Sequence, residues 1–176
     1  MQRGNNRSAI FSTPVDYEVF LDLARTVAGQ RQVAVHAYAL MTNHYHLLVT
    51  PETSDGIPRM MKALNGRYVR YYNRRYQRVG TLWNGRYRGI SIGDERYWLT
   101  CLRYIEQNPA RAGITEDLAS YPWSSYRIHA TESTAPTWLM THPIYAGLGT
   151  TDAERQLAYR SICANLIDPG EAYGVL

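Results

Sequence analysis

Two apolar runs joined by a short link constrain the fold of this chain more than any other feature of its sequence. Residues 33–41 and 44–50 alternate apolar with other side chains, and Thr42-Asn43 separates them. Alternation with a period of two is typical of strands, and a two-residue link is typical of an antiparallel hairpin. We therefore expect strands at Val33–Met41 and His44–Thr50, with Pro51 closing the second.

A helix is expected on the N-terminal side of this hairpin. Apolar residues recur at helical spacing over residues 16–28. Pro14 lies just before this segment and Gly29 just after it, and both residue types are common at helix ends.

Three further elements are expected after the hairpin. Residues 57–78 form an arginine-rich amphipathic pattern that Gly80 ends. Residues 86–92 alternate in the manner of a strand. A last helix starts after Asp94, a good N-cap, and is broken at Asn108-Pro109.

The expected order of elements is helix, strand, strand, helix, strand, helix, which indicates an α+β fold with helices packed on an antiparallel sheet. A ferredoxin-like sheet of this order starts with a strand before the first helix, but residues 3–7 have the composition of a turn. We therefore expect the first strand to be absent or the start to be truncated. Residues 1–126 are expected to form the main domain and residues 127–176 an accessory C-terminal extension, with a helix over 151–166.

Positive charge is concentrated in the middle of the sequence. Residues 59–111 hold twelve basic residues against three acidic ones, a net charge of +9, whereas the rest of the chain holds seven against twelve, a net charge of −5. Eighteen of the nineteen basic residues are arginine, whose guanidinium group forks onto phosphate oxygens and stacks on exposed bases. Tyrosines interleave with arginines over residues 67–76, which favours nucleic acid as the partner.

Other features of the composition predict a soluble cytoplasmic protein. Cys101 and Cys163 are far apart and match no metal-binding spacing, so we expect two reduced thiols. No stretch approaches the roughly 18 to 20 apolar residues of a membrane helix, and the N-terminus lacks the apolar run of a secretory signal. No long apolar face remains after the core is assigned, which favours a monomer, with a dimer as the alternative.

The second strand of the hairpin carries a pair of histidines. His44 and His46 are two residues apart, so their side chains point to one face of the strand while Tyr45 points to the other. Two imidazoles at this spacing can share one divalent ion. A histidine pair on a strand is more often a hydrogen-bonded surface feature, so the pattern alone does not establish a metal site.

The expected helix after Asp94 has two distinct faces. One face carries, at spacings of four, three and four, Tyr97, Cys101, Tyr104 and Asn108. The neighbouring face carries the apolar residues Trp98, Leu102 and Ile105. We expect the apolar face to pack on the sheet, which directs the Tyr104 hydroxyl and the Asn108 amide toward the histidine pair. A tyrosine merely packed between helix and sheet is the ordinary alternative.

Seven blocks in order along the chain resemble the REP-associated tyrosine transposases, relatives of the single-tyrosine HUH transposases of insertion sequences. The blocks cover most of the chain and include His-Tyr-His at residues 44–46 and Arg-Tyr-Ile-Glu-Gln-Asn-Pro at residues 103–109. The seven blocks lie at residues 3–7, 36–48, 64–68, 72–75, 80–87, 103–113 and 123–126.

This resemblance implies a ferredoxin-like domain in which His44 and His46 bind a metal ion and Tyr104 is the attacking nucleophile. Asn108, one helical turn after Tyr104, is our choice for a third ligand. Two imidazoles and one amide oxygen, with open positions left over, suit Mg²⁺ or Mn²⁺. Glu106 points elsewhere on the helix, so no acceptor for the phenolic proton is assigned.

The resemblance further implies metal-dependent cleavage and strand transfer of single-stranded DNA beside short palindromic hairpins, through a 5′-phosphotyrosine intermediate. Arginines are expected to hold the DNA backbone, and aromatic rings to stack on bases. The arginines are Arg67, Arg70, Arg74, Arg75, Arg86, Arg88 and Arg111. The aromatic residues are Tyr68, Tyr72 and Trp83.

Three other functions remain open at the level of sequence. The chain could bind hairpin DNA or RNA without cutting it. It could be a metal-dependent hydrolase in which water replaces Tyr104, or a structural protein in which the His-x-His pattern arose by chance.

Overall fold

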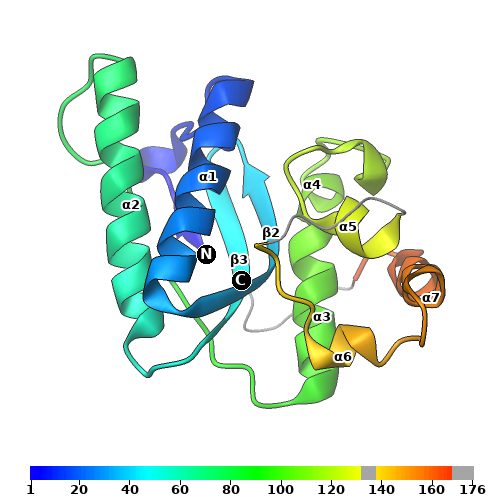
Figure 1. The fold of residues 1–176 in the computed structure, drawn as a ribbon. Helices are drawn as coiled ribbons and strands as arrows, with labels where there is room; N and C mark the ends of the chain where they lie inside the picture. The colour runs from blue at the N-terminus through cyan, green and yellow to red at the C-terminus, as the bar shows by residue number, and fades with distance from the viewer. Residues whose placement is uncertain (132–137, 168–176) are drawn as a thin grey trace.

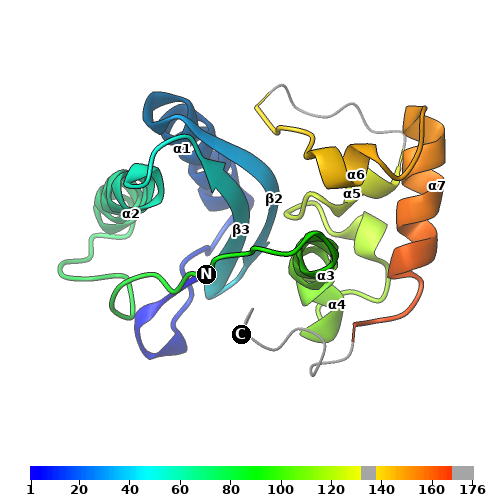
Figure 2. The ribbon, with the colours of Figure 1, turned by 90° about the horizontal axis from the view of Figure 1, so that it is seen from below.

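A three-stranded antiparallel sheet lies between two layers of helices (Figures 1 and 2). The computed structural model describes residues 1–131 and 138–167. Helices α1 (Pro14–Arg31) and α2 (Gly56–Arg75) cover one face of the sheet, and α3 (Glu95–Glu106) covers the other. The α+β class expected from the order of elements is confirmed.

The central hairpin forms where the sequence predicts it. Strand β2 (Val33–Met41) pairs antiparallel with β3 (His44–Pro51), and Met41 is opposite His44 across the two-residue turn. Nearly all of β2 is buried because helices cover both of its faces. A shift in register between Val35 and Ala37 marks a β-bulge.

The first strand is short but present, which corrects the expectation that it is absent. Strand β1 (Gln2–Arg3) pairs antiparallel with β3, which gives the sheet order β1-β3-β2. A 3-10 turn, η1 (Asn5–Arg7), follows it. The sequence signal for a turn therefore belongs to residues 5–7, immediately after this strand.

The strand predicted over residues 86–92 does not form. This segment meets the sheet edge at one residue pair: the Arg88 amide donates to the Met1 carbonyl (2.9 Å), and the Met1 amino group donates to the Arg88 carbonyl (2.7 Å). A strand requires a ladder of repeated hydrogen bonds, and β1 extends over only two residues. An apolar pocket, lined in part by Leu47, Val49 and Ile92, lies between this segment and β3.

Two helix ends differ from the predicted ones, because residues other than glycine adopt left-handed conformations there. Helix α1 continues past Gly29 to Arg31, and Gln32 ends it at φ 52°. Helix α2 stops at Arg75, and Gln77 follows in the left-handed region at φ 50°. Left-handed residues at a helix C-terminus redirect the chain without requiring glycine.

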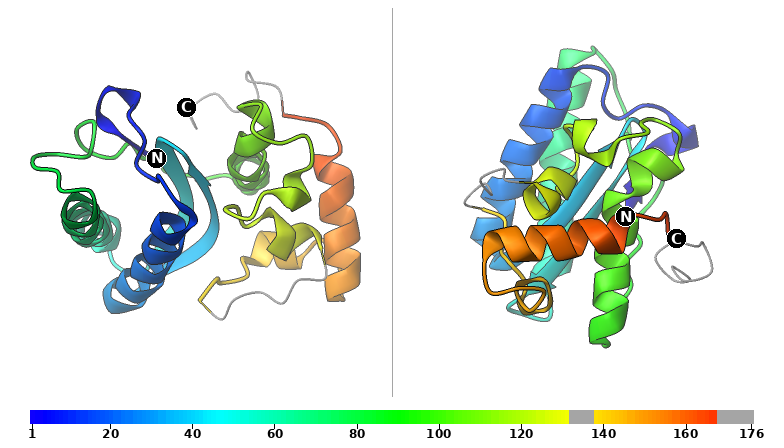
Figure 3. Two further views of the ribbon diagram at one scale, coloured as in Figure 1. Left: turned by 90° about the horizontal axis from the view of Figure 1, so that it is seen from above. Right: turned by 90° about the vertical axis from the view of Figure 1, so that its right-hand side faces the viewer.

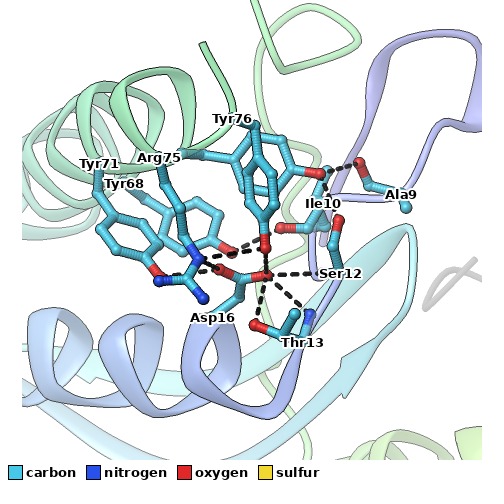
Figure 4. A network of polar contacts seen from close by, with 10 residues as sticks. Ala9, Ile10, Ser12, Thr13, Asp16, Tyr68, Tyr71, Arg75 and Tyr76 are labelled. Carbon is cyan, nitrogen blue, oxygen red and sulfur yellow. Dashed lines mark hydrogen bonds and ion pairs between the residues drawn. The ribbon is translucent and has the colours of Figure 1, made fainter. Parts of the chain in front are cut away.

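A buried carboxylate joins α1 to the end of α2 (Figure 4). Asp16 is fully buried and accepts hydrogen bonds from the Tyr71 hydroxyl (2.8 Å) and the Tyr76 hydroxyl (2.7 Å). It also accepts from the backbone amides of Ser12 (2.8 Å) and Thr13 (2.9 Å), which caps the start of α1. The two tyrosine hydrogen bonds and an ion pair with Arg75 at 3.6 Å therefore fix the two helices to each other.

The layer around α3 contains most of the remaining helices. They are α4 (Asn108–Arg111), the 3-10 turn η2 (Leu118–Ser120), α5 (Tyr126–Ala130), α6 (Pro143–Ala146) and α7 (Asp152–Cys163). Helix α7 runs crosswise to α3 (Figure 3). Tyr145, Tyr159 and Cys163 from this region pack in the same apolar cluster as Trp98 and Leu102 of α3.

Cys101 and Cys163 are both free and buried, as predicted. Among the helices in the described ranges, none has the length and apolarity needed to cross a membrane.

Candidate active site

Strand β3 presents the two histidines on the face of the sheet that α3 covers. The ring centroids of His44 and His46 are 5.2 Å apart, and the rings meet edge to face. His46 is buried, whereas His44 is half-buried. Tyr45 points to the opposite layer, where its hydroxyl donates to Asn65 Oδ1 of α2 at 2.6 Å. The alternation predicted for this strand is confirmed.

Helix α3 positions Tyr104 opposite the histidines. The Asp94 side chain caps the helix by accepting from the Tyr97 amide (2.9 Å), and the predicted apolar face, Trp98, Leu102 and Ile105, is buried. As a result the Tyr104 ring lies 6.0 Å from the His46 ring, centroid to centroid. The helix therefore places the phenol beside the paired imidazoles, as the spacing predicts.

Tyr104 is enclosed in this conformation. Its side chain is only 4% exposed, and the guanidinium carbon of Arg111 lies 5.1 Å from the centre of its ring. Arg111 is itself held by a hydrogen bond to the Ile167 carbonyl. Neighbouring side chains therefore cover most of the phenol ring in this conformation.

Both histidines are strongly biased toward the neutral form. Burial and, to a smaller extent, the positive charge of Arg3 lower the pKa of His44 to about 4, although the Asn108 side chain opposes the shift. Burial, the N-terminal ammonium group and His44 hold the pKa of His46 well below its usual value. Neutral imidazole is the form that binds metals.

The ligand types at this site fit a divalent metal ion of borderline softness. The Asn108 side chain lies close enough to His44 to raise its pKa, and its amide nitrogen donates to the Tyr104 carbonyl (3.2 Å), so the third predicted ligand lies beside the histidine pair. In the part of the chain that the structure describes, no three side chains of His, Cys, Asp or Glu form a metal-binding group. Among the described residues, a third protein ligand would therefore be of another type, such as the Asn108 amide oxygen.

The predicted DNA-binding arginines separate into two groups. Arg67, Arg70, Arg74 and Arg75 lie on α2, in the layer across the sheet from the histidines. Arg111 lies over the Tyr104 ring, and Arg86 and Arg88 border a pocket at β1. The structure thus brings only Arg86, Arg88 and Arg111 to the histidine side or the β1 edge of the sheet.

The aromatic residues predicted to stack on bases are part of the core, which corrects that prediction. Tyr68 is fully buried and its hydroxyl donates to the Ile10 carbonyl. Tyr72 and Trp83 are 5% and 9% exposed, and the Trp83 indole donates to the Asn65 carbonyl (3.2 Å). Their faces pack on other aromatic rings, so they are not open to bases.

Sequence reasoning missed one charged residue at the site. Arg3 lies directly opposite His44 in the pairing of β1 with β3, and its charge depresses the pKa of both histidines. The alternation signal could not reveal it, because a two-residue strand carries no period.

Glu106 is directed away from Tyr104, as predicted. Its buried carboxylate accepts from His129 Nδ1 (2.7 Å), from the Tyr159 hydroxyl (2.7 Å) and from the Ser125 hydroxyl. These contacts attach α5 and α7 to α3, so Glu106 has a structural place and does not reach the phenol.

Comparison with known proteins identifies the family. A family model described as "Transposase IS200 like" matches residues 1–108, more than half of the chain, and includes His44, His46, Tyr104 and Asn108. A solved structure of a REP-associated tyrosine transposase bound to a REP hairpin has a similar fold. Its TM-score is 0.57 at 14% sequence identity, over 80% of this chain and 82% of that chain. No curated protein matches the chain. The resemblance found in the sequence is therefore confirmed, and the chain belongs to the IS200-like transposase family.

Proposed function

We propose that this protein is a metal-dependent single-strand DNA endonuclease and strand transferase that acts beside short hairpins, with Tyr104 as its nucleophile. The observation that carries this proposal is the placement of the Tyr104 ring beside the pair His44 and His46. The ring comes from α3 and the histidines from β3, which are distant in sequence. The family match supports DNA cleavage and transfer as the general activity.

The proposed reaction is a transesterification. The Tyr104 oxygen attacks the scissile phosphorus in line, a bond from the phenolic oxygen to phosphorus forms, and the bond to the 3′ oxygen of the preceding nucleotide breaks. The phenol loses its proton and the leaving oxygen gains one, so the products are a 5′-phosphotyrosine and a free 3′-hydroxyl. A second 3′-hydroxyl can then attack the phosphotyrosine and reseal the strand without a nucleotide cofactor.

His44, His46 and Asn108 would hold Mg²⁺ or Mn²⁺, and the two nitrogen ligands favour Mn²⁺ in affinity. When bound, this ion would supply charge stabilisation at the phosphate oxygens. The nearby Arg3 repels a cation but attracts a phosphate, so we expect metal and DNA to bind more tightly together than separately.

Arginines around the site would hold the DNA backbone. Arg111, Arg86 and Arg88 lie on the histidine side or the β1 edge, whereas the α2 arginines can contact only DNA that extends to the other layer. The similar REP-associated transposase was solved with a REP hairpin, which supports hairpin DNA as the substrate class. A monomer remains the expected active form.

The test is covalent capture of the nucleophile. A labelled hairpin with single-stranded flanks, incubated with the protein and Mn²⁺, should give an adduct that resists denaturation. Tyr104→Phe should give no adduct and no cleavage while it keeps hairpin affinity. Cleavage that persists in Tyr104→Phe would instead favour a hydrolase that uses water.

A hairpin-binding protein that does not cut is the second candidate, and the enclosure of Tyr104 is the observation that favours it. It predicts hairpin binding without an adduct at any Mn²⁺ concentration. The nuclease instead predicts an adduct that forms with Mn²⁺ in wild type and is absent from Tyr104→Phe.

A further inference from the structure

A polar pocket next to the candidate active site is not used by the proposed reaction. It lies between β1 and the loop of residues 84–88, and it is lined by Met1, Gln2, Arg3, Asn84, Arg86 and Arg88. Three of these six residues are arginines, and none is acidic.

Backbone hydrogen bonds fix both walls of this pocket. The Asn84 amide donates to the Arg3 carbonyl (2.8 Å) at one end, and Met1 and Arg88 exchange two hydrogen bonds at the other. Between these anchors Gly85 adopts a left-handed conformation (φ 72°), and its carbonyl accepts from Gln2 Nε2 (3.2 Å). The loop is thus attached to the strand at three points, so hydrogen bonds hold the walls of the pocket in place.

The charge in this pocket is not neutralised. Within the described residues, Arg3, Arg86 and Arg88 form no ion pair with a carboxylate. The Arg3 Nε atom is buried and has no hydrogen-bond partner. An unsatisfied buried donor destabilises the folded protein, and this cost is recovered when an anion accepts from it.

The pocket is also in the right place to serve the candidate active site. Arg3 and His44 are directly opposite each other in the β1–β3 ladder, and directly opposed residues project to the same face. A DNA strand whose scissile phosphate lies at His44 and His46 would therefore continue past Arg3.

We propose that this pocket binds one nucleotide of the single strand adjacent to the scissile phosphate, with Arg3, Arg86 and Arg88 on its phosphate. Asn84 supplies a polar group for the sugar or base. This inference rests on the proposed function, since it places a neighbouring nucleotide of the same substrate, and it makes the pocket a positioning site for the reaction.

The experiment replaces single phosphates of the hairpin flank by neutral methylphosphonates and measures Kd in EDTA, so that binding is read without cleavage. At one position within about two nucleotides of the cleavage site, the neutral linkage should weaken binding to wild type about tenfold. In Arg86→Gln the same linkage should have less than about a twofold effect, because the contact is already lost. Arg88→Gln is expected to behave in the same way.

Arg70→Gln is the matched control, because it removes one exposed arginine from α2 on the other layer. It should keep the full tenfold effect of the neutral linkage. The inference is overturned if no linkage couples to Arg86 or Arg88, or if Arg70→Gln removes the effect equally. Coupling without a covalent adduct would support the nucleotide-binding pocket and refute the proposed nuclease function. An adduct without coupling would refute only the proposed role of the pocket.

Discussion

Two polar clusters lie on opposite sides of the same sheet and differ in how well their hydrogen-bonding groups are satisfied. Asp16, between α1 and α2, is fully buried and receives four hydrogen bonds from two tyrosines and two backbone amides at 2.7 to 2.9 Å (Figure 4). The cluster under α3 instead joins two neutral histidines, the Tyr104 ring and an amide, with the cation Arg3 beside them.

The difference separates a structural cluster from a candidate catalytic one. Burial raises the pKa of Asp16, but the hydrogen bonds from Tyr76, Ser12, Tyr71 and Thr13 outweigh it and hold the pKa below its usual value. A carboxylate with this many hydrogen bonds gains no further stabilisation from a bound ligand. The histidines are uncharged and Arg3 has a buried donor without a partner, so a metal ion and a phosphate would supply what that side of the sheet lacks.

The largest expected effect is on the histidine side. His44→Ala should lower the rate of metal-dependent cleavage at least about 1000-fold, because loss of a ligand removes several kcal/mol of charge stabilisation. It should also abolish the rise in Tm that Mn²⁺ produces in wild type, measured by thermal unfolding with and without the ion. Hairpin affinity in EDTA serves as the control and should change less than about threefold. Cleavage at the wild-type rate would show that this histidine is not a ligand.

Removal of the Asp16 carboxylate should affect stability and leave chemistry intact. Asp16→Ala leaves several buried donors without an acceptor and should lower the free energy of unfolding by about 3–5 kcal/mol. The corresponding fall in Tm is roughly 6–20 °C. Asp22→Ala in the same helix, which removes an exposed ion pair with Arg25, should cost less than about 0.5 kcal/mol. A normal Tm in Asp16→Ala, or a slower reaction per folded molecule, would break the distinction between the clusters.

The two sides should also separate along the pH axis. His36 and His46 are buried and their folded pKa values lie below the ordinary 6.5. The unfolded chain therefore takes up protons that the folded chain excludes as pH falls below 6.5. Their contribution to stability is complete above pH 6.5 and is lost toward lower pH, at up to about 1.4 kcal/mol per pH unit for each histidine.

Asp16 contributes in a lower window, because its folded pKa lies below the ordinary 3.8 and its stabilisation is lost only as pH falls below that value. Urea unfolding should show a fall in the free energy of unfolding between pH 7 and pH 5 in wild type. Asp16→Asn should show the same fall from a lower starting value. A free energy of unfolding that does not change between pH 7 and pH 5 would contradict the assignment of neutral buried histidines.

The smallest effect is expected from the α2 arginines. Arg70→Gln should weaken hairpin binding about two- to threefold and reduce the salt dependence of binding by about one charge. The rate of adduct formation from the bound complex should stay unchanged, since α2 lies across the sheet from Tyr104. A slower step in the bound complex would mean that the two layers act together on the DNA.

The sequence predicted those parts of the molecule that depend on regular periodicity. The hairpin, the alternation of His44, Tyr45 and His46, and the face of α3 that carries Tyr104 all follow from periods of two or 3.6 residues. The motif blocks added the family, and the family match confirms it.

The rest depends on tertiary contacts that periodicity does not encode. Residues 86–92 alternate like a strand, but among the described residues they have only Met1 as a backbone partner on the sheet. The arginine and tyrosine pattern of α2 predicted a stacking surface, whereas Tyr68 and Tyr72 fill the core and leave the arginines outside. Arg3 reaches the site through a strand too short to carry a pattern.

The most direct measurement is to locate the covalent bond by mass spectrometry. After reaction with a labelled hairpin and Mn²⁺, tryptic digestion should release residues 104–111 as one peptide. Of the fifteen tyrosines in the chain, this peptide contains only Tyr104. The account predicts that this peptide carries the 5′-phosphate of the DNA fragment. A nucleotide attached to any other tyrosine, or cleavage with this peptide unmodified throughout, would contradict it.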